Sequence, residues 1–459
     1  MKDEQLPQYD EKTRRRIEAM VEAEARYLAQ MRRHPRGPLA SPARMTGRRG
    51  FLAAAAAGAS LLPTIVHAKA PPGAVERPVP ADPTKEQGTP TNDDGGYGSR
   101  SQFESETRWR FGTATRESSW TMTPLENGVG VITPSGLHFE RHHGGIATID
   151  PSRHSLLVHG MVDQPKKYSV ADIRRFPSIS RTMFIECSGN GLTEWSKPTL
   201  KTVQGTHGLT STSEWTGVPL ALLLKESGLK PGAKWVLAEG ADAAVMTRSI
   251  PLEKCLEDAF IAYGQNGEAI RPEQGYPIRL VLPGWEGNTH IKWLRRLEVS
   301  DVPFMTREET SKYTDLLPDG RARQFTFVME AKSVITCPSG EMRLPGPGFY
   351  EVTGLAWSGR GKITRLEVST DGGKSWADAH LQGPVLAICH TRFRFPWFWD
   401  GKPAVLQSRA TDETGYVQPS LKQLVDVRGL NGPLGSIYHL NAIQSWAVAA
   451  DGSVSNVHA

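Results

Sequence analysis

Residues 274–299, QGYPIRLVLPGWEGNTHIKWLRRLEV, contain two short apolar runs separated by a glycine-rich turn. The runs, within residues 276–287 and 290–300, end in turn residues, which is typical of strands in a buried or half-buried sheet. Residues 154–162 (HSLLVHGMV) and 181–189 (RTMFIECSG) show the same pattern. The sequence therefore predicts a sheet formed by these segments.

Two segments between these strands have helical spacing instead. Residues 218–229 (VPLALLLKESGL) place apolar side chains at helical intervals and end at Gly228. Residues 250–263 (IPLEKCLEDAFIAY) form a second candidate helix with Pro251 near its start. Because strands and helices are mixed, we expect an α+β fold in this part of the chain.

The pattern changes near residue 326. Residues 348–359, 362–376 and 404–419 are short candidate strands separated by turns, with no helical segment among them. The triplet at 371–373 is Asp-Gly-Gly, a strong hairpin signal because glycine tolerates positive φ. This spacing favours a β-sandwich, and we place the domain boundary near Phe325.

The N-terminal segment reads as a targeting signal. Residues 46–68, TGRRGFLAAAAAGASLLPTIVHA, contain Arg48-Arg49, a weakly apolar run and small residues at the end, as in a twin-arginine export signal. The run is short and broken by Pro63, which argues against a membrane anchor. We expect residues 1–68 to be a signal peptide, residues 69–97 to be a flexible arm, and the protein to reach the periplasm already folded.

Charge and composition exclude several classes of function. The whole net charge of +5 lies in residues 1–68, which hold 12 Lys and Arg against 7 Asp and Glu, so the rest of the chain is neutral. A basic surface for nucleic acid is therefore not expected. No later stretch is long and apolar enough for a membrane span. The chain also has no Cys-x-x-Cys-His motif, so no covalent haem is expected.

One cysteine stands in an unusual place. Cys187 lies in IECSGNGLTEW (185–195), between an apolar run and a glycine-rich turn. The other cysteines, Cys255, Cys337 and Cys389, are distant in sequence, so a Cys-x-x-Cys element is excluded. Three interpretations remain: an inert core thiol, a nucleophile, or a single thiolate ligand to a metal.

Several motifs together resemble the sulfite oxidase family of molybdenum enzymes. They are FERHHG (139–144), ECSGNG (186–191), GAD (240–242), residues 274–299 above, GLAWSGRGKITRLEVSTDGGKSW (354–376) and RATDETGYVQP (409–419). Their order along residues 130–446 follows that of the family. The resemblance implies a molybdenum–pterin domain over residues 98–325. It also implies an immunoglobulin-like β-sandwich over residues 326–459 that forms a homodimer.

The resemblance also implies the site. Cys187 corresponds to the only protein ligand of the molybdenum, whose other sulfurs come from the dithiolene of molybdopterin. Arg141 and Tyr313 correspond to catalytic residues beside the metal. The implied pterin contacts are His138, Phe139, Glu140, Arg141, His142, Asp242, Gln274, Arg279, His290, Ile291 and Lys292. Gln274 stands where the family usually has histidine.

The chain departs from sulfite oxidases at the substrate pocket. Arginine, tryptophan and arginine of the family correspond here to Gly191, the Thr206-His207 segment and Asn441. This pattern resembles the sulfane dehydrogenase branch, which acts on sulfane sulfur attached to a carrier protein's cysteine in thiosulfate oxidation. We expect these changes to open the pocket. Oxygen-atom transfer is implied, with electrons passed to a separate cytochrome c subunit.

Three alternatives stay open from the sequence. A periplasmic sulfite dehydrogenase of the same fold would act on free sulfite. A methionine sulfoxide reductase of the same superfamily would usually lack the full second domain. A non-catalytic immunoglobulin-like binding protein would contain no molybdenum.

Overall fold

The computed structural model describes residues 97–112, 115, 117–195, 198–317, 319–429 and 439–458, together with seven isolated positions between residues 15 and 29. The elements below belong to one compact unit that includes residues 106–459. Apart from those positions and Tyr97, the predicted signal peptide and arm lie outside the described residues. Among the described residues, no helix is long and apolar enough to cross a membrane.

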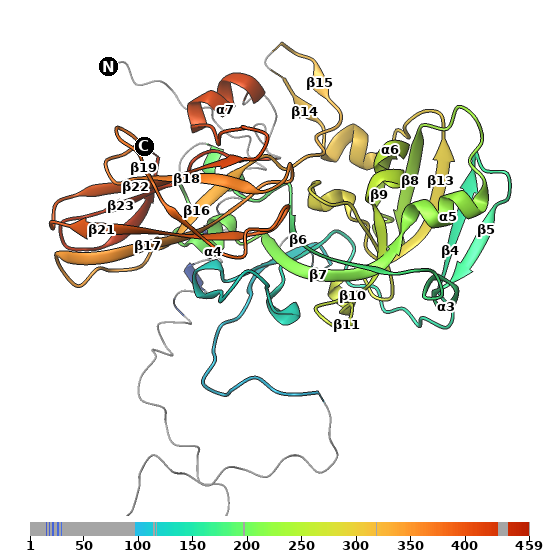
Figure 1. Cartoon of the computed structure of the whole chain (residues 1–459), viewed down its shortest axis with the longest axis horizontal. Coiled ribbons are helices and arrows are strands. Elements are labelled where there is room, and N and C mark those ends of the chain that lie inside the picture. The colour runs from blue at the N-terminus through green and yellow to red at the C-terminus, as the bar shows by residue number, and fades with distance from the viewer. Residues whose placement is uncertain are drawn as a thin grey trace, which may run out of the picture. The chain divides into compact units, whose positions relative to one another are not determined.

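Two sheets form the centre of the first domain (Figure 1). One has the order β11 (Glu268–Ala269), β10 (Phe260–Gln265), β7 (Thr210–Pro219) and β6 (Ile179–Glu186), with β12 (Arg279–Val281) also paired with β10. The other has the order β5 (Lys166–Ser169), β4 (Ser155–Gly160), β13 (Leu294–Ser300), β8 (Trp235–Gly240) and β9 (Thr247–Pro251). The strands predicted at 154–162, 181–189, 276–287 and 290–300 are thus confirmed as β4, β6, β12 and β13.

The first predicted helix is also confirmed. Helix α5 (Leu220–Ser227) ends at Gly228, whose φ of +69° suits glycine. Its buried leucines, Leu223 and Leu224, pack in one core cluster with Leu297 of β13. The helix forms because its apolar side chains recur at helical spacing and can be buried against the sheet.

The second predicted helix, at 250–263, is wrong in its second half. Helix α6 (Leu252–Glu257) ends at Asp258, and β10 begins at Phe260. The side chains of Phe260 and Ile261 are completely buried, and β10 pairs with β7 on one side and β12 on the other. Burial between two strands decided the structure of a short apolar run whose periodicity alone was ambiguous.

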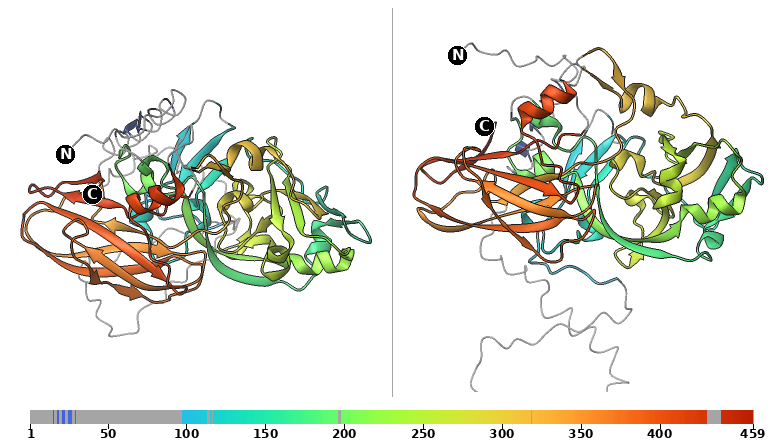
Figure 2. Two further views of the ribbon diagram at one scale, coloured as in Figure 1. Left: turned by 90° about the horizontal axis from the view of Figure 1, so that it is seen from above. Right: turned by 45° about the horizontal axis from the view of Figure 1, so that its top comes forward.

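The second domain is a sandwich of two sheets, seen as stacked layers in Figure 2. One sheet has the order β16 (Lys332–Cys337), β17 (Gly348–Trp357), β21 (Thr391–Trp399) and β20 (His380–Gln382). The other has the order β19 (Ala377–Asp378), β18 (Ile363–Ser369), β22 (Ala404–Asp412), β23 (Ser445–Val448) and β24 (Val454–Val457). Between β18 and β19, Gly372 and Gly373 adopt the expected positive φ, +74° and +86°. Trp357, Phe393 and Trp446 fill the space between the sheets.

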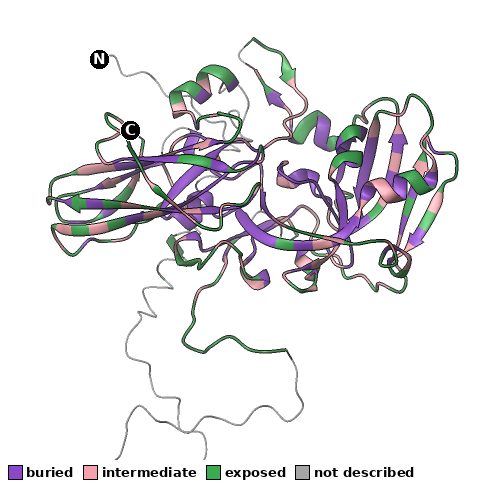
Figure 3. Cartoon of the chain, viewed as in Figure 1, coloured by how far each residue is buried: buried purple, intermediate pink, exposed green. Residues whose placement is uncertain are grey.

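Smaller elements complete the described fold. They are the sheet β1 (Trp109–Gly112), β2 (Ser119–Met122) and β3 (Glu140–His142), the hairpin β14 (Asp315–Leu316) and β15 (Ala322–Arg323), and the helices α3 (Val170–Ile173), α4 (Val203–His207) and α7 (Leu421–Arg428). Figure 3 shows that buried residues follow the strands of both domains, whereas α7 and the hairpin are largely exposed. The mixed first domain and the sheet-rich second domain, which also contains α7, agree with the predicted fold class.

Candidate functional site

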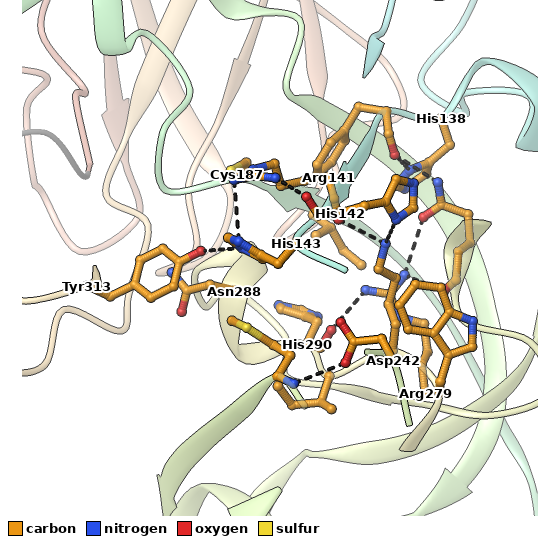
Figure 4. A pocket seen from close by; sticks show the side chains of 18 residues that line it. His138, Arg141, His142, His143, Cys187, Asp242, Arg279, Asn288, His290 and Tyr313 are labelled. Atoms are coloured by element: carbon orange, nitrogen blue, oxygen red, sulfur yellow. Dashed lines mark hydrogen bonds between the residues drawn. The ribbon is translucent and has the colours of Figure 1, made fainter. Parts of the chain in front are cut away.

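A cavity of about 670 Å³, including space open to solvent, gathers segments that are distant in sequence. Figure 4 shows its lining, which consists of His138, Phe139, Arg141, His142, His143, Ile185, Cys187, Asp242, Met246, Gln274, Arg279, Gly287, Asn288, His290, Ile291, Lys292, Trp293 and Tyr313. All of the site residues implied by the resemblance belong to this lining, except Glu140. The fold therefore brings the separate motifs together around one space.

Cys187 directly follows β6, where the chain leaves the sheet. Its backbone N–H donates to the carbonyl oxygen of Leu209 (2.9 Å), and the N–H of Asn190 donates to the Cys187 carbonyl (2.9 Å). Burial raises the pKa of the Cys187 thiol, although a hydrogen bond from the Gly189 backbone opposes this shift. A metal bound here therefore has to displace a proton from the sulfur.

Arg279 and Lys292 are two of the three cationic residues that line the cavity, with Arg141. Arg279 is 3% exposed; its guanidinium donates to the carbonyl of Gln274 (2.9 Å) and lies 4.8 Å from the ring centre of Trp215. Half-buried Lys292 donates to the carbonyls of Arg141 and Glu273, both at 3.0 Å. Burial lowers the pKa of Arg279 to about 9, and burial together with Arg279 lowers that of Lys292 to about 7. This wall is suited to an anionic ligand.

His138 and Arg279 carry the polar atoms that best indicate which kind of ligand the cavity suits. Burial lowers the pKa of His138 to about 3, so its ring is neutral. Its Nδ1 lies 3.1 Å from the Phe139 carbonyl, which can only accept, so Nε2 is left as an acceptor. That Nε2 and the donor Nε of Arg279 are buried and have no hydrogen-bond partner among the residues that the structure describes. A ligand with both N–H donors and anionic oxygens would satisfy them, and a pterin phosphate has both.

Gln274 and Asp242 are held by the protein. The Gln274 amide donates to the Phe139 carbonyl (2.8 Å), and its oxygen lies 3.4 Å from a guanidinium nitrogen of Arg279. Gln274 thus lines the cavity at the position where the resemblance implies a histidine. Asp242 accepts from the backbone N–H of Met246 (3.0 Å), which fixes its carboxylate at the cavity.

Glu140 does not reach the cavity, which corrects the expected direct pterin contact. Its carboxylate pairs with Arg108 and lies 2.9 Å from Nε2 of His142. The other ring nitrogen of His142 lies 3.0 Å from the Lys292 ammonium. Glu140 and His142 are two residues apart on strand β3 and share one face, so the Glu140 carboxylate orients the His142 ring without itself lining the cavity.

His143 is a cavity residue that the sequence interpretation missed. Its Nε2 lies 2.9 Å from the hydroxyl of Tyr313, and its Nδ1 lies 3.4 Å from the guanidinium of Arg141 (Figure 4). Burial, assisted by Arg141, lowers the pKa of His143 to about 2, so the ring is neutral. Because Arg141 can only donate, Nδ1 accepts and Nε2–H donates to Tyr313. The sequence did contain a signal for this residue, because His143 directly follows Arg141 and His142 in the motif FERHHG.

The other missed lining residues are Ile185, Met246, Gly287, Asn288 and Trp293. A Cβ on Gly287 would lie 2.7 Å from the Glu186 carbonyl oxygen, so only glycine allows this approach to the cysteine loop. Asn288 donates to the hydroxyl of Ser188 (3.1 Å). No sequence signal marked these contacts, because the partners are about a hundred residues apart.

The positions expected to open the pocket do not line the cavity. Gly191 has a φ of +87°, and a Cβ there would lie 3.0 Å from the Leu440 side chain. His207 is completely buried, and Asn441, also buried, donates to the Ala331 carbonyl (3.2 Å). Leu440 therefore occupies the space that a side chain at position 191 would need. An arginine introduced at 191 would be strained as well as crowded.

The donor set suits a metal that brings most of its own ligands. Among the residues that the structure describes, no group of three or more His, Cys, Asp and Glu side chains is placed to hold a metal ion. Cys187 offers one thiolate at the cavity, and all four cysteines are free. A thiophilic metal already chelated by dithiolene sulfurs needs only one such ligand, so the residues present fit molybdopterin.

Comparisons with known proteins agree with this assignment. The family model "Oxidoreductase molybdopterin binding domain" matches residues 143–308, and "Mo-co oxidoreductase dimerisation domain" matches residues 323–445. Sulfite oxidase from Gallus gallus is 30% identical over 340 residues, which are 67% of this chain and 72% of that protein. An NADH nitrate reductase from Solanum lycopersicum is 33% identical over 66% of this chain, but the chain spans only 37% of that protein.

Among solved structures, the sulfane dehydrogenase SoxCD from Paracoccus pantotrophus contains a similar chain. It is 46% identical with a TM-score of 0.79, and the match covers 84% of this chain and 100% of that chain. Both domains are thus found together in one solved protein.

The lowered pKa of Lys292 makes a pH-dependent prediction for the ligand-free protein. Between about 7 and the ordinary 10.5, the unfolded chain binds more protons than the folded chain, so the free energy of unfolding rises with pH. Lys292→Met should remove up to about 1.4 kcal/mol per pH unit from this slope. Denaturant unfolding at pH 7, 8, 9 and 10 measures it. Lys167→Met, at an exposed lysine, is the control and should keep the wild-type slope; an unchanged slope in Lys292→Met would contradict the prediction.

Proposed function

Because the chain belongs to the sulfite oxidase family of molybdenum enzymes, we propose that it oxidises sulfane sulfur attached to a carrier protein's cysteine. The observation that carries the proposal is the match to a sulfane dehydrogenase, at 46% identity over the whole of that chain. The cavity supports it, since Cys187 and the implied pterin contacts line one space. When bound, the molybdenum–pterin group supplies a metal that transfers an oxygen atom to sulfur and takes up two electrons.

The residues of this chain have distinct tasks in the proposal. Cys187 would lose its thiol proton and supply the thiolate that holds the metal. Arg279 and Lys292 would hold the anionic end of the pterin, and Nε2 of His138 would accept a hydrogen bond from one of its N–H groups. These contacts hold the group against one wall of the cavity and exclude water from that wall.

Arg141 and Tyr313 face the reacting sulfur in this scheme. His143 joins them in one hydrogen-bonded row, so their polar groups keep a fixed separation. Positioning of this kind reduces the entropic cost of bringing a tethered substrate to the metal. The neutral ring of His143 does this without adding a second charge beside Arg141.

The preference for a carrier-bound sulfur over free sulfite rests on charge. Gly191 and Asn441 stand at two positions where the resemblance to sulfite oxidases implies arginine. Each charge-assisted hydrogen bond contributes roughly 1.5–3 kcal/mol to binding an anion. A chain without both cations should hold the sulfite dianion weakly, whereas a substrate tethered to a protein gains affinity from the carrier surface.

Electron transfer and location complete the proposal. The two electrons pass to a separate c-type cytochrome subunit, since the sequence contains no haem-attachment motif. The twin-arginine signal at Arg48-Arg49 would export the folded, cofactor-loaded protein to the periplasm.

Loss of the metal ligand tests the assignment of Cys187. Cys187→Ser should fold but retain little molybdenum, because a hydroxyl is a poor ligand for this metal. Turnover should fall by roughly two orders of magnitude or more, beyond the 10–100-fold typical of outer-shell changes. Metal analysis and steady-state kinetics measure this. Cys337→Ser, at an exposed cysteine, is the matched control and should behave as wild type. Full activity in Cys187→Ser would refute the ligand role.

Substrate choice is tested with the cytochrome as electron acceptor. Carrier-bound sulfane should support turnover, and free sulfite should show a Michaelis constant at least about tenfold above that of the Gallus gallus sulfite oxidase, given the loss of two charge-assisted bonds. Comparable efficiency on sulfite, with none on the carrier, would make the chain a sulfite dehydrogenase. A purified protein that contains no molybdenum would favour the binding-protein alternative.

The second domain predicts a homodimer. Its match to a dimerisation model supports contacts between two copies, most simply with twofold symmetry. Sedimentation at micromolar concentration should give about twice the 50.4 kDa chain mass, reduced by any cleaved signal peptide. A monomer under these conditions would argue against it.

A further inference from the structure

A buried carboxylate lies immediately beside the metal-ligand candidate. Glu186 precedes Cys187, ends strand β6 and is 1% exposed. One oxygen accepts from the Lys332 ammonium (2.9 Å) and from the Asn190 amide (2.8 Å), and the other accepts from the Trp357 indole N–H (2.7 Å). The carboxylate is therefore fixed by three donors on two sides.

Two of these donors belong to the second domain. Lys332 begins β16 and Trp357 ends β17, and the register pairs these two residues directly across the sheet. The same ammonium also donates to the backbone carbonyl of Asn190 (3.2 Å). One side chain of the second domain therefore holds both ends of the loop 186–190, with Cys187 between them.

A further contact comes from the C-terminal part of the same domain. The backbone N–H of His439 donates to the Ser188 carbonyl (2.6 Å), while Asn288 of the first domain donates to the Ser188 hydroxyl (3.1 Å). The residue after Cys187 is thus also held from both domains. The loop cannot move without breaking bonds on each side.

The chemistry of the Glu186–Lys332 pair suggests a role in geometry. Lys332 is also 1% exposed. Removing both charges from water costs more free energy than the attraction within one ion pair usually provides. Burial lowers the pKa of Lys332, while Glu186 opposes that shift. Apolar side chains in place of this ion pair would stabilise the fold at least as well as the ion pair does. Directional bonds to one carboxylate, however, fix where the adjacent residue lies.

We propose that Glu186, Lys332 and Trp357 form a positioning device through which the second domain fixes Cys187 for metal binding. The second domain, which matches a dimerisation model, then also positions the metal ligand of its own chain. This inference rests on the proposed function only in taking Cys187 as the ligand. Groups that orient a metal ligand typically change metal affinity or activity 10–100-fold when lost.

Four variants separate positioning from general stability. Lys332→Met removes the ammonium, and Glu186→Gln keeps the shape of the side chain but removes its charge. Trp357→Phe removes the N–H donor together with the five-membered ring of the indole and keeps an aromatic ring in the core. Cys389→Ala is the control: it deletes a buried contact, from Sγ to the Thr182 carbonyl (2.8 Å), between the second domain and the same strand β6. It leaves residues 186–190 untouched.

The readouts are molybdenum per chain, the Mo(V) electron paramagnetic resonance spectrum, thermal unfolding and turnover. Lys332→Met and Glu186→Gln should lower molybdenum retention about tenfold and change the spectrum of the metal that remains. Trp357→Phe, which leaves the Glu186–Lys332 pair in place, should keep the metal but shift the spectrum. Cys389→Ala should lower the unfolding temperature alone. The double variant Glu186→Gln/Lys332→Met should lose no more than Lys332→Met, because the two groups act as a unit.

Wild-type metal content and an unchanged spectrum in Lys332→Met, Glu186→Gln and Trp357→Phe would overturn the inference, whatever their stability. Independent, additive losses in the double variant would also overturn it. If Lys332→Met does not fold, the other two single variants decide. Absence of molybdenum from the wild type would instead overturn the proposed function, and this inference with it.

Discussion

Burial of positive charge is the constraint on which the cavity depends. Arg279 is removed from water, Lys292 is half-buried beside it, and the pKa of each is lowered. A buried cation is stable only when opposite charge or hydrogen-bond acceptors surround it. Carbonyl groups supply part of this requirement, and within the described part of the chain the Nε of Arg279 has no partner. The fold is therefore organised around a ligand that brings negative charge to this wall.

The opposite side of the cavity is organised around a different requirement. A thiolate ligand must hold a fixed position, yet Cys187 lies in a glycine-containing loop, which is intrinsically adaptable. The surroundings supply the rigidity. Gly287 allows a backbone segment of the first domain to approach the loop closely, and Glu186 ties the loop to the second domain. Anion binding and metal binding are thus supported by separate parts of the structure.

The resemblance to sulfite oxidases identified 12 of the 18 residues that line the cavity. Motifs such as FERHHG and ECSGNG were sufficient for this, because their residues act locally and keep their spacing. Reasoning about the pocket failed at Gly191, because the side chain that fills the space, Leu440, is about 250 residues away in sequence. The absence of a side chain at one position does not create a void when another segment packs there.

Local chemistry could be read from the sequence alone: strands β4, β6, β12 and β13, helix α5 with its terminal glycine, the change to a sandwich, and the single cysteine after β6. These depend on periodicity and on neighbouring residues. Tertiary structure alone decided that residues 260–263 form a strand and that Glu140 contacts His142 and does not line the cavity. It also decided that Lys332, 146 positions from Glu186, reaches the cysteine loop. The reason is that burial and ion pairing depend on which distant segments meet, and no local pattern encodes that.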